Sequence, residues 1–385
     1  MNKLHFDYII IGAGAAGLML ARAMAEDAYF SNMSILVLDK DQKKENDRTW
    51  CFWEKGPGQF DPLVSRSWDQ ICFKGRKTSE QFNIAPYRYK MVRGIDFYTE
   101  YLKALKNTHN LDLRYEEVIE VNDTGTSVTV KTDQNDYTAS KVFNSIFNLK
   151  EAKKQTKYPV LQQHFVGWRI KTDRPVFNSE TVTYMDFSVP QKGNTRFMYL
   201  LPLSNNEALV EYTLFSKDLL PRKVYEQAIE TYIDNKLGRP QYEIIEREEG
   251  RIPMTCYDFA QHNTRHILHI GTAGGWAKPS TGYAFMPTAK KIPIVIEDLK
   301  RGKPLNSIRF KNRFWYYDLL LLDVLFHHNQ KGHLVFESLF KNVSPRSILK
   351  FLDEETTLLE DLRVIWGCPK PIFIRILGAR LQYRQ

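Results

Sequence analysis

The strand predicted over residues 208–215 carries a carboxylic acid where its pattern favours an apolar side chain. Alternate residues of a strand share one face, so Glu211 lies with Leu209, Thr213 and Phe215. Burial on such a face raises the pKa of a carboxyl group and keeps a transferable proton near neutral pH, as a general acid requires. A glutamate paired with a lysine or an arginine on an exposed face fits the same pattern, and the residues alone leave both interpretations open.

A glycine-rich turn near the start of the chain predicts a dinucleotide site. A β-branched and aromatic run over residues 7–11 indicates a buried parallel strand, and Gly12, Gly14 and Gly17 follow it in G-x-G-x-x-G register. These glycines allow a tight turn, the approach of a pyrophosphate to the backbone, and close packing of helix on strand. An ordinary glycine-rich turn is the alternative.

The residues after this turn complete the dinucleotide pattern. A helix is predicted from Ala15 to Ala25, and a second strand over residues 34–38 ends on Asp39. A carboxylate at this position can accept both hydroxyl groups of an adenosine ribose. We therefore expect Ala15 and Asp39 to contact the cofactor.

Two arginines are further candidates for cofactor contacts. Arg48 lies in an aromatic segment, residues 47–53, that we predict to be irregular; the segment either lines a binding cleft or forms a satellite core. Arg93 precedes a helix predicted over residues 95–106, where a solvated arginine is the alternative.

A second turn of small residues lies between a strand predicted at 266–270 and a helix predicted at 286–299. Such a turn places backbone N–H groups and a positive helix end beside an anion. Two such turns, far apart in the sequence, favour a tightly bound flavin dinucleotide over a diffusible nicotinamide. The candidate contacts in the second turn are Gly271, Thr272, Ala273, Pro279, Thr281, Gly282 and Tyr283.

Between the two turns the pattern changes from mixed helix and strand to mainly strand. Turn residues separate runs with alternating polarity, which predicts an antiparallel sheet inserted into an α/β domain. The predicted strands are 111–121, 127–132, 141–147, 164–170, 181–187, 197–203, 208–215 and 242–254; the predicted helices are 222–236 and several within 310–385.

Composition narrows the range of partners. A chain of 385 residues with 43% hydrophobic and 26% charged residues suggests about two globular domains, and 13% aromatic residues suit a large apolar ligand. The net charge of +9 suits an anionic cofactor or an anionic membrane surface. No basic run or known recognition module favours nucleic acid, so we expect none to bind.

Cysteine and histidine spacing predicts neither a disulfide framework nor a metal site. Cys51, Cys72, Cys256 and Cys368 are far apart, and no histidine group has standard ligand spacing. The first predicted strand begins within six residues, so we expect no targeting peptide and a cytoplasmic protein. The longest apolar segment, 314–326, contains two aspartates and is too short to span a bilayer.

Four motifs of this sequence resemble those of the lycopene cyclases. They are the first glycine turn, D-R-T-W at 47–50, V-E-Y-T at 210–213, and G-T-A-G-G-W-A-K-P-S-T-G-Y at 271–283, and the resemblance covers most of the chain. The glycine turn is shared with many flavoproteins, whereas P-x-T-G-Y and E-x-T are specific. Flavin hydroxylases usually carry Gly-Asp where this chain has Gly271-Thr272. This difference argues against the hydroxylase subgroup and fits the cyclases better.

The resemblance implies an α/β fold. A Rossmann-type FAD-binding domain of the flavin-hydroxylase-like fold would contain an inserted antiparallel-sheet substrate domain and be followed by a helical C-terminal region. The expected bounds are 1–160 and 255–305 for the FAD-binding domain, 161–254 for the substrate domain, and 306–385 for the helical region.

The resemblance also implies a reaction of carotenoid biosynthesis. A lycopene cyclase is an intramolecular lyase that converts the linear ends of lycopene into β-ionone rings without net redox change. It would require FAD in its reduced form, with NAD(P)H serving only as the reductant. Glu211 would be the catalytic acid, and Thr213, Trp276, Tyr283 and Phe285 would contact the substrate, the aromatic rings through cation–π stabilisation. Packing of the turn against the sheet is the alternative for these rings.

A carotene enters its enzyme from lipid, so we expect peripheral attachment to the inner membrane. The candidate contact combines apolar and basic residues of the C-terminal region. These are Phe314, Trp315, Tyr316 and Leu319–Leu322, with Arg309, Lys311, Arg313, Arg375, Arg380 and Arg384. A packed helical subdomain is the alternative.

Two other functions remain open at this stage. A monooxygenase or prenyl-chain reductase of the same fold would consume NAD(P)H in proportion to product. A membrane-associated protein that binds flavin or lipid without catalysis would leave carotenes unchanged. The sequence does not specify one-end or two-end cyclisation, the ring isomer, the preferred carotene, NADH or NADPH, or the oligomeric state.

Overall fold

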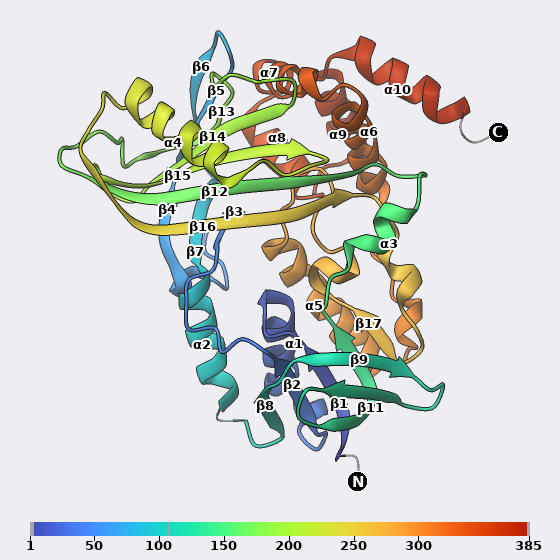
Figure 1. The fold of residues 1–385 in the computed structure, drawn as a ribbon. Coiled ribbons are helices and arrows are strands. Elements are labelled where there is room, and N and C mark those ends of the chain that lie inside the picture. Colours follow the sequence, from blue (N-terminus) through green and yellow to red (C-terminus); the bar gives the residue numbers. More distant parts are fainter. Residues whose placement is uncertain (1–3, 107, 383–385) are drawn as a thin grey trace. The chain divides into compact units, whose positions relative to one another are not determined.

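The computed structural model describes residues 4–106 and 108–382. The chain divides into two compact units (Figure 1): unit 1 comprises residues 1–46, 93–157 and 256–312, and unit 2 comprises 47–92, 158–255 and 313–385. Residues 47–92, expected in the first domain, belong to unit 2, because β5 (Gln70–Lys74) pairs with β13 (Thr181–Asp186) of that unit.

Unit 1 is built on a parallel sheet with the strand order β8–β2–β1–β11, and β17 pairs with the other edge of β11. The central strands are buried on both faces, and for this reason their sequences are continuous apolar runs. Helix α1 packs against α2 and α5. The bounds are β1 Leu4–Ile11, α1 Ala15–Glu26, β2 Ile35–Asp39, α2 Gly94–Lys106, β8 Leu111–Tyr115, β11 Asp136–Asn144, α3 Leu149–Lys154, β17 Ile267–His269 and α5 Phe285–Lys300.

The single strand predicted at 111–121 is wrong, because the chain changes partners at Glu116. Strand β8 pairs with β2, whereas β9 (Val118–Asp123) pairs with β10 (Val128–Thr132). Between β8 and β9, the buried carboxylate of Glu116 accepts hydrogen bonds from the hydroxyl groups of Thr132 and Tyr137. These bonds stabilise the break between the two strands.

Unit 2 contains two sheets, of which the larger has the strand order β16–β12–β15–β14–β13–β5–β6. It is antiparallel except for the β5–β13 pair. The bounds in this sheet are β5 Gln70–Lys74, β6 Ser79–Asn83, β12 Val160–Thr172, β13 Thr181–Asp186, β14 Thr195–Pro202, β15 Glu207–Ser216 and β16 Tyr242–Thr255.

The second sheet of unit 2 has the order β3–β7–β4. Its strands are β3 (Thr49–Lys55), β4 (Val64–Trp68) and β7 (Tyr87–Arg93). The prediction that residues 47–53 are irregular is therefore wrong: most of this segment is strand β3, in which Phe52 and Trp53 are buried.

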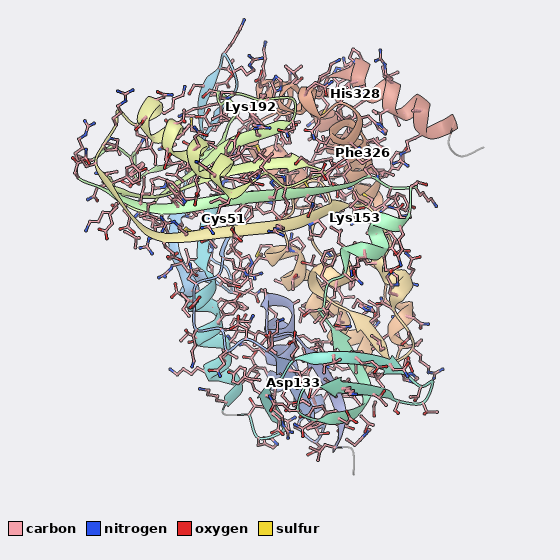
Figure 2. The ribbon with its side chains drawn as sticks, viewed as in Figure 1. Cys51, Asp133, Lys153, Lys192, Phe326 and His328 are labelled. Atoms are coloured by element: carbon pink, nitrogen blue, oxygen red, sulfur yellow. The ribbon has the colours of Figure 1, made fainter. Side chains whose placement is uncertain are left out.

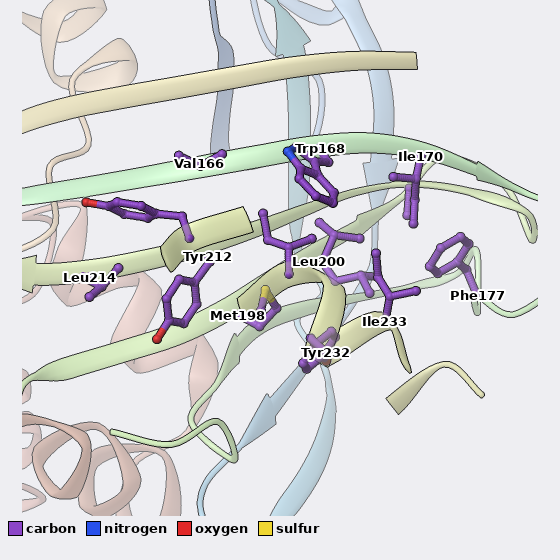
Figure 3. Close-up of a cluster of buried hydrophobic side chains, with 14 residues drawn as sticks. Val166, Trp168, Ile170, Phe177, Met198, Leu200, Tyr212, Leu214, Tyr232 and Ile233 are labelled. Atoms are coloured by element: carbon purple, nitrogen blue, oxygen red, sulfur yellow. The ribbon is translucent and has the colours of Figure 1, made fainter. Parts of the chain in front are cut away.

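One face of the larger sheet packs against helix α4 (Arg222–Lys236) around a hydrophobic cluster (Figure 3). The even-numbered residues of β12 and β15, such as Val166 and Val210, point into this cluster. Strand alternation therefore places the odd-numbered residues, including Glu211, on the opposite face.

A buried histidine links the sheet to α4. The Nε2 atom of His164 lies 2.7 Å from the hydroxyl oxygen of Ser216, and its Nδ1 atom lies 2.6 Å from that of Tyr225. Burial, with a smaller contribution from the positive charge of Arg196, lowers the pKa of His164 to about 4. The folded chain therefore holds this imidazole in its neutral form at neutral pH.

The C-terminal part of unit 2 is helical, as predicted. Buried carboxylates join its helices: Asp361 accepts a hydrogen bond from Arg313 Nε at 2.6 Å, and Asp323 accepts two from Arg380. The helices are α6 Arg313–His327, α7 Gly332–Asn342, α8 Pro345–Leu352, α9 Leu358–Trp366 and α10 Lys370–Gln382. Within the described residues, none of the helices has both the length and the hydropathy needed to cross a bilayer.

Of the seven apolar residues of α6 that the sequence analysis assigned to a membrane contact, three lie in the core and four are partly buried. Phe314, Leu319 and Leu322 are at most 4% exposed. Arg384 of the same set lies outside the described residues. Exposed apolar side chains instead gather on α9, where Leu358, Leu359, Leu362, Ile365 and Trp366 are each between 41% and 73% exposed.

Candidate active site and cofactor site

The first glycine turn has the geometry of an anion site. Gly12 adopts a φ of +97°, and a Cβ atom at Gly17 would lie 1.8 Å from the carbonyl oxygen of Gly12, so helix and strand meet too closely for any side chain there. A Cβ atom at Gly14 would meet no protein atom within 4 Å. Helix α1 begins at Ala15 with no side-chain cap and no acidic residue in its first turn, which leaves its positive end available to an anion.

Asp39 lies beside this turn. Its Oδ2 atom accepts a hydrogen bond from the backbone N–H of Ala13 at 2.6 Å, and its Oδ1 atom accepts one from Asp41 at 2.8 Å. The carboxylate is therefore fixed at the end of β2, next to the open space at Gly14. These residues fit the pyrophosphate and ribose of a dinucleotide.

The second turn touches the first. It begins with the short 3₁₀ segment Gly271–Gly274, and a Cβ atom at Gly271 would lie 3.0 Å from that of Ala16. The structure thus brings Gly271, Thr272 and Ala273 to the N-terminal end of α1. Pro279, Thr281, Gly282 and Tyr283 follow in a loop closed by hydrogen bonds from the N–H of Lys278 to the carbonyl of Tyr283 and from the N–H of Gly282 to that of Lys278.

Two of the aromatic residues near this turn are packed into unit 1. Trp276 is 1% exposed and its ring packs edge-on against Phe310, with centroids 5.6 Å apart. Phe285 is 3% exposed and packs in the same manner against Phe97 at 5.5 Å. These contacts agree with the alternative in which the two rings pack within the protein instead of contacting the substrate.

The two candidate arginines fall in different units. Arg93 immediately precedes α2 in unit 1, whereas Arg48 lies in unit 2 and pairs with Asp47 at 2.6 Å. The two turns, Asp39 and Arg93 therefore belong to unit 1, whereas Arg48 does not.

The acid predicted from the sequence is half of a buried carboxyl pair. Glu211 on β15 is opposite Gly167 on β12, and Gly167 is opposite Glu248 on β16, so the three residues form a row across three neighbouring strands. Both glutamates are buried, and their carboxyl groups are hydrogen-bonded to each other. Each also accepts a hydrogen bond from a threonine: Glu211 from Thr213 and Glu248 from Thr49, the latter at 2.8 Å.

The surroundings of the pair favour protonated carboxyl groups. Burial is the largest cause that raises the pKa of Glu211. Burial again, followed by the negative charge of Glu211, raises the pKa of Glu248. Loss of a proton from one glutamate opposes its loss from the other, so the pair retains a proton at neutral pH.

Hydroxyl and thiol groups from β3, β7 and β14 also face the pair. Tyr199 is next to Glu211 on β14, and its hydroxyl group hydrogen-bonds to that of Tyr89. Cys51, labelled in Figure 2, interacts with both tyrosines and with both glutamates. Burial raises the pKa values of Cys51 and Tyr89 above their usual range, so both remain protonated.

Glu248 is the buried carboxyl neighbour of Glu211 that the sequence analysis did not single out. It lies in the charged run E-R-E-E at 246–249, which reads as a solvated strand. The signal was Gly167, an interior strand glycine with no turn around it, since such a glycine often marks a close approach by another group. A Cβ atom there would lie 3.1 Å from Cγ of Glu248, so the glycine leaves room for this side chain.

In the described part of the chain, no group of three or more histidine, cysteine, aspartate or glutamate side chains is arranged to hold a metal ion. Among the described residues, the carboxyl pair in unit 2 is suited to proton transfer, and the two turns in unit 1 are suited to anion binding.

Comparison with known proteins gives a family match along nearly the whole chain. A family model described as "Lycopene cyclase protein" matches residues 7–375. A relative named lycopene beta-cyclase, from Pseudescherichia vulneris, is 24% identical over 390 residues that cover 94% of each chain.

Solved structures share the fold at low sequence identity. A geranylgeranyl bacteriochlorophyll reductase-like protein from Thermoplasma acidophilum is 12% identical with a TM-score of 0.61, and the match covers 98% of this chain and 100% of that one. The halogenase PltM L111Y mutant, solved in complex with FAD, is 12% identical with a TM-score of 0.59, covering 93% and 83%. The predicted fold class is confirmed: a mixed α/β flavoprotein fold with an inserted, mainly antiparallel sheet and a helical C-terminal region.

Proposed function

The chain belongs to the lycopene cyclase family, and on this basis we propose that it cyclises the linear ends of lycopene to β-ionone rings and yields β-carotene without net redox change. The observation that carries the proposal is the buried carboxyl group of Glu211. It lies on the E-x-T strand and is held by Thr213 and by a second carboxyl group. A protonated carboxyl group in a site that excludes water suits proton transfer to an alkene.

Ring formation at an isoprenoid end needs a proton on the terminal double bond and the removal of another proton from the new ring. Glu211 is the proton donor in our proposal, because its pKa is raised by burial and the group is protonated near neutral pH. Thr213 orients the carboxyl group through its hydrogen bond. The hydroxyl group of Tyr89 and the thiol group of Cys51 stay protonated because they are buried, so they do not compete as bases for the ring proton.

We assign the dinucleotide site of unit 1 to FAD. Gly12, Gly14 and the N-terminal end of α1 would hold the pyrophosphate, Asp39 the ribose, and residues 271–283 the rest of the cofactor. The FAD complex of the fold-related halogenase supports this assignment. Reduced FAD, when bound, supplies an electron-rich anionic ring that can stabilise a cation, and NAD(P)H would serve only to reduce it.

We also propose peripheral attachment to the inner membrane from the cytoplasm, through the outward face of α9. Its five exposed apolar side chains occupy a helix of nine residues. Arg363 and Lys370 are exposed on and beside this helix, and Lys370 lies 3.7 Å from the centre of the Trp366 ring. An apolar face with basic neighbours suits a bilayer that contains anionic lipids, which is where a carotene dissolves.

The experiment is expression in a bacterium that accumulates lycopene, with the pigments separated by chromatography. We expect β-carotene from the wild-type chain and lycopene alone from Glu211→Gln at equal protein and flavin content. A hydroxylated or hydrogenated pigment would favour the monooxygenase or reductase alternative. Unchanged lycopene with flavin-loaded wild-type protein would favour a binding protein.

A further inference from the structure

The function proposed above uses Glu248 only as a neighbour that holds the proposed acid. We propose, on the basis of that function, that Glu248 is a positioning residue that acts through Glu211, so that the two carboxyl groups share a proton, deliver it to the carotene and receive the ring proton in return. The pair would then be both the acid and the base of one cyclisation.

The strand geometry favours this arrangement over an accidental meeting of two acids. Glu211 and Glu248 lie on strands that are separated by β12, and any side chain at the intervening position would occupy the space between them. Gly167 occupies that position, and a Cβ atom there would lie 3.1 Å and 3.4 Å from atoms of the Glu248 side chain. Glu248 therefore extends over Gly167 and reaches the carboxyl group of Glu211.

A hydrogen bond between two carboxyl groups requires a proton on at least one of them, because an ionised carboxylate can only accept. In the reaction, an O–H bond of Glu211 breaks as a C–H bond forms at the terminal double bond. The electrons of a second double bond then form the C–C bond of the ring. A ring C–H bond breaks, its electrons form the new ring double bond, and its proton returns to the carboxyl pair, so that atoms and electrons balance without an oxidant or a reductant.

Proton return is driven by the charge left on the pair. After donation, the carboxyl groups carry an additional negative charge at short distance, and like charges at one site increase the affinity for a proton. The groups that act most strongly on the pair are Thr213, Thr49 and Glu246, with Cys51 and Tyr199 also facing it. None of these groups carries a positive charge that would stabilise two ionised glutamates.

The test is the pH dependence of cyclisation by the flavin-loaded, reduced protein, measured for the wild type, Glu248→Gln, Thr49→Val and Glu249→Gln. The active form has a proton on Glu211, so the rate falls as pH rises through the pKa of the pair. Glu248→Gln removes the like charge, and we expect this fall at a pH lower by about one unit or more.

Thr49→Val removes a hydrogen bond that stabilises ionised Glu248, and therefore raises the pH at which the cyclisation rate falls. Glu249→Gln is the matched control on the same strand, because Glu249 is exposed and lies on the opposite face. Its profile should coincide with that of the wild type.

Infrared titration of the same proteins gives a readout that does not need turnover. A carboxylic C=O band that persists at neutral pH in the wild type should titrate at lower pH in Glu248→Gln. The proposal would be overturned if Glu248→Gln and Thr49→Val both had the same pH profile of the cyclisation rate as the wild type. If Glu248→Gln does not fold, an unchanged profile of Thr49→Val alone would overturn it. A wild-type protein that shows the band but leaves lycopene unchanged would instead overturn the proposed function.

Discussion

Substitutions at two glycines of the first turn should have different effects, one on cofactor binding and the other on stability. We predict that Gly14→Val empties the FAD site of a protein that remains folded, whereas Gly17→Ala unfolds the protein more easily. The difference follows from the space around each glycine. A Cβ atom at Gly14 meets no protein atom within 4 Å, whereas one at Gly17 would lie 1.8 Å from the carbonyl oxygen of Gly12.

The magnitudes follow from these distances. Gly14 is the N-cap of α1 and has a φ of −80° and a ψ of −172°, an extended conformation that valine adopts, so we expect a stability cost of no more than about 1 kcal/mol. A methyl group at Gly17 forces α1 away from β1, and such overpacking costs about 1–3 kcal/mol or more. The valine side chain of Gly14→Val would occupy the open space at this position, which a pyrophosphate needs.

The assay combines the flavin content of each purified variant, from its absorbance spectrum, with its denaturation midpoint in urea. We expect Gly14→Val to lose most of its flavin at a nearly unchanged midpoint and Gly17→Ala to lower the midpoint clearly. A full complement of FAD in Gly14→Val would refute the assignment of this turn to the pyrophosphate.

Three further predictions concern unit 2. Glu211→Gln keeps the shape of the side chain without its proton, so the cyclisation rate should fall at least about a hundredfold at unchanged flavin content; a smaller loss would move the acid elsewhere. Leu362→Glu on α9 should weaken binding to anionic vesicles about tenfold. Ile119→Glu on β9, at an equally exposed position, should leave vesicle binding unchanged. Equal effects of the two substitutions would argue against α9 as the membrane contact. Because the pKa of His164 is lower in the folded chain than in the unfolded chain, the free energy of unfolding should fall by about 3 kcal/mol as pH falls from 6.5 to about 4. Urea unfolding of His164→Gln should depend less on pH in this interval. An unchanged pH dependence would contradict the assignment of this effect to His164.

Much of the fold could be predicted from local sequence patterns. The helix at Arg222–Lys236 and strands β12 to β16 follow from periodicity, and the glycine turn follows from residue types that have few alternative uses. The break at Glu116 could not be predicted, because it depends on the donors Thr132 and Tyr137, which come later in the chain. Strand β3 lacks a regular alternation of polar and apolar residues, so periodicity does not reveal it.

The candidate site was only half visible in the sequence. Glu211 stands out because it interrupts an apolar strand face, whereas Glu248 lies among charged residues and becomes distinctive only when Gly167 is placed between the two. That register is a property of strand pairing between segments about 40 and about 80 residues apart, which periodicity within one segment cannot reveal. The sequence analysis assigned the membrane contact to α6 and not to α9, because only tertiary packing determines which apolar side chains are exposed.

The most direct test of the central claim is anaerobic turnover of lycopene by the purified protein loaded with reduced FAD, with NAD(P)H at a small fraction of the lycopene concentration. Our account predicts that many molecules of β-carotene form for each NAD(P)H consumed and that the product has the mass of lycopene. Consumption of one NAD(P)H for each product molecule, or a product with a different mass, would contradict it.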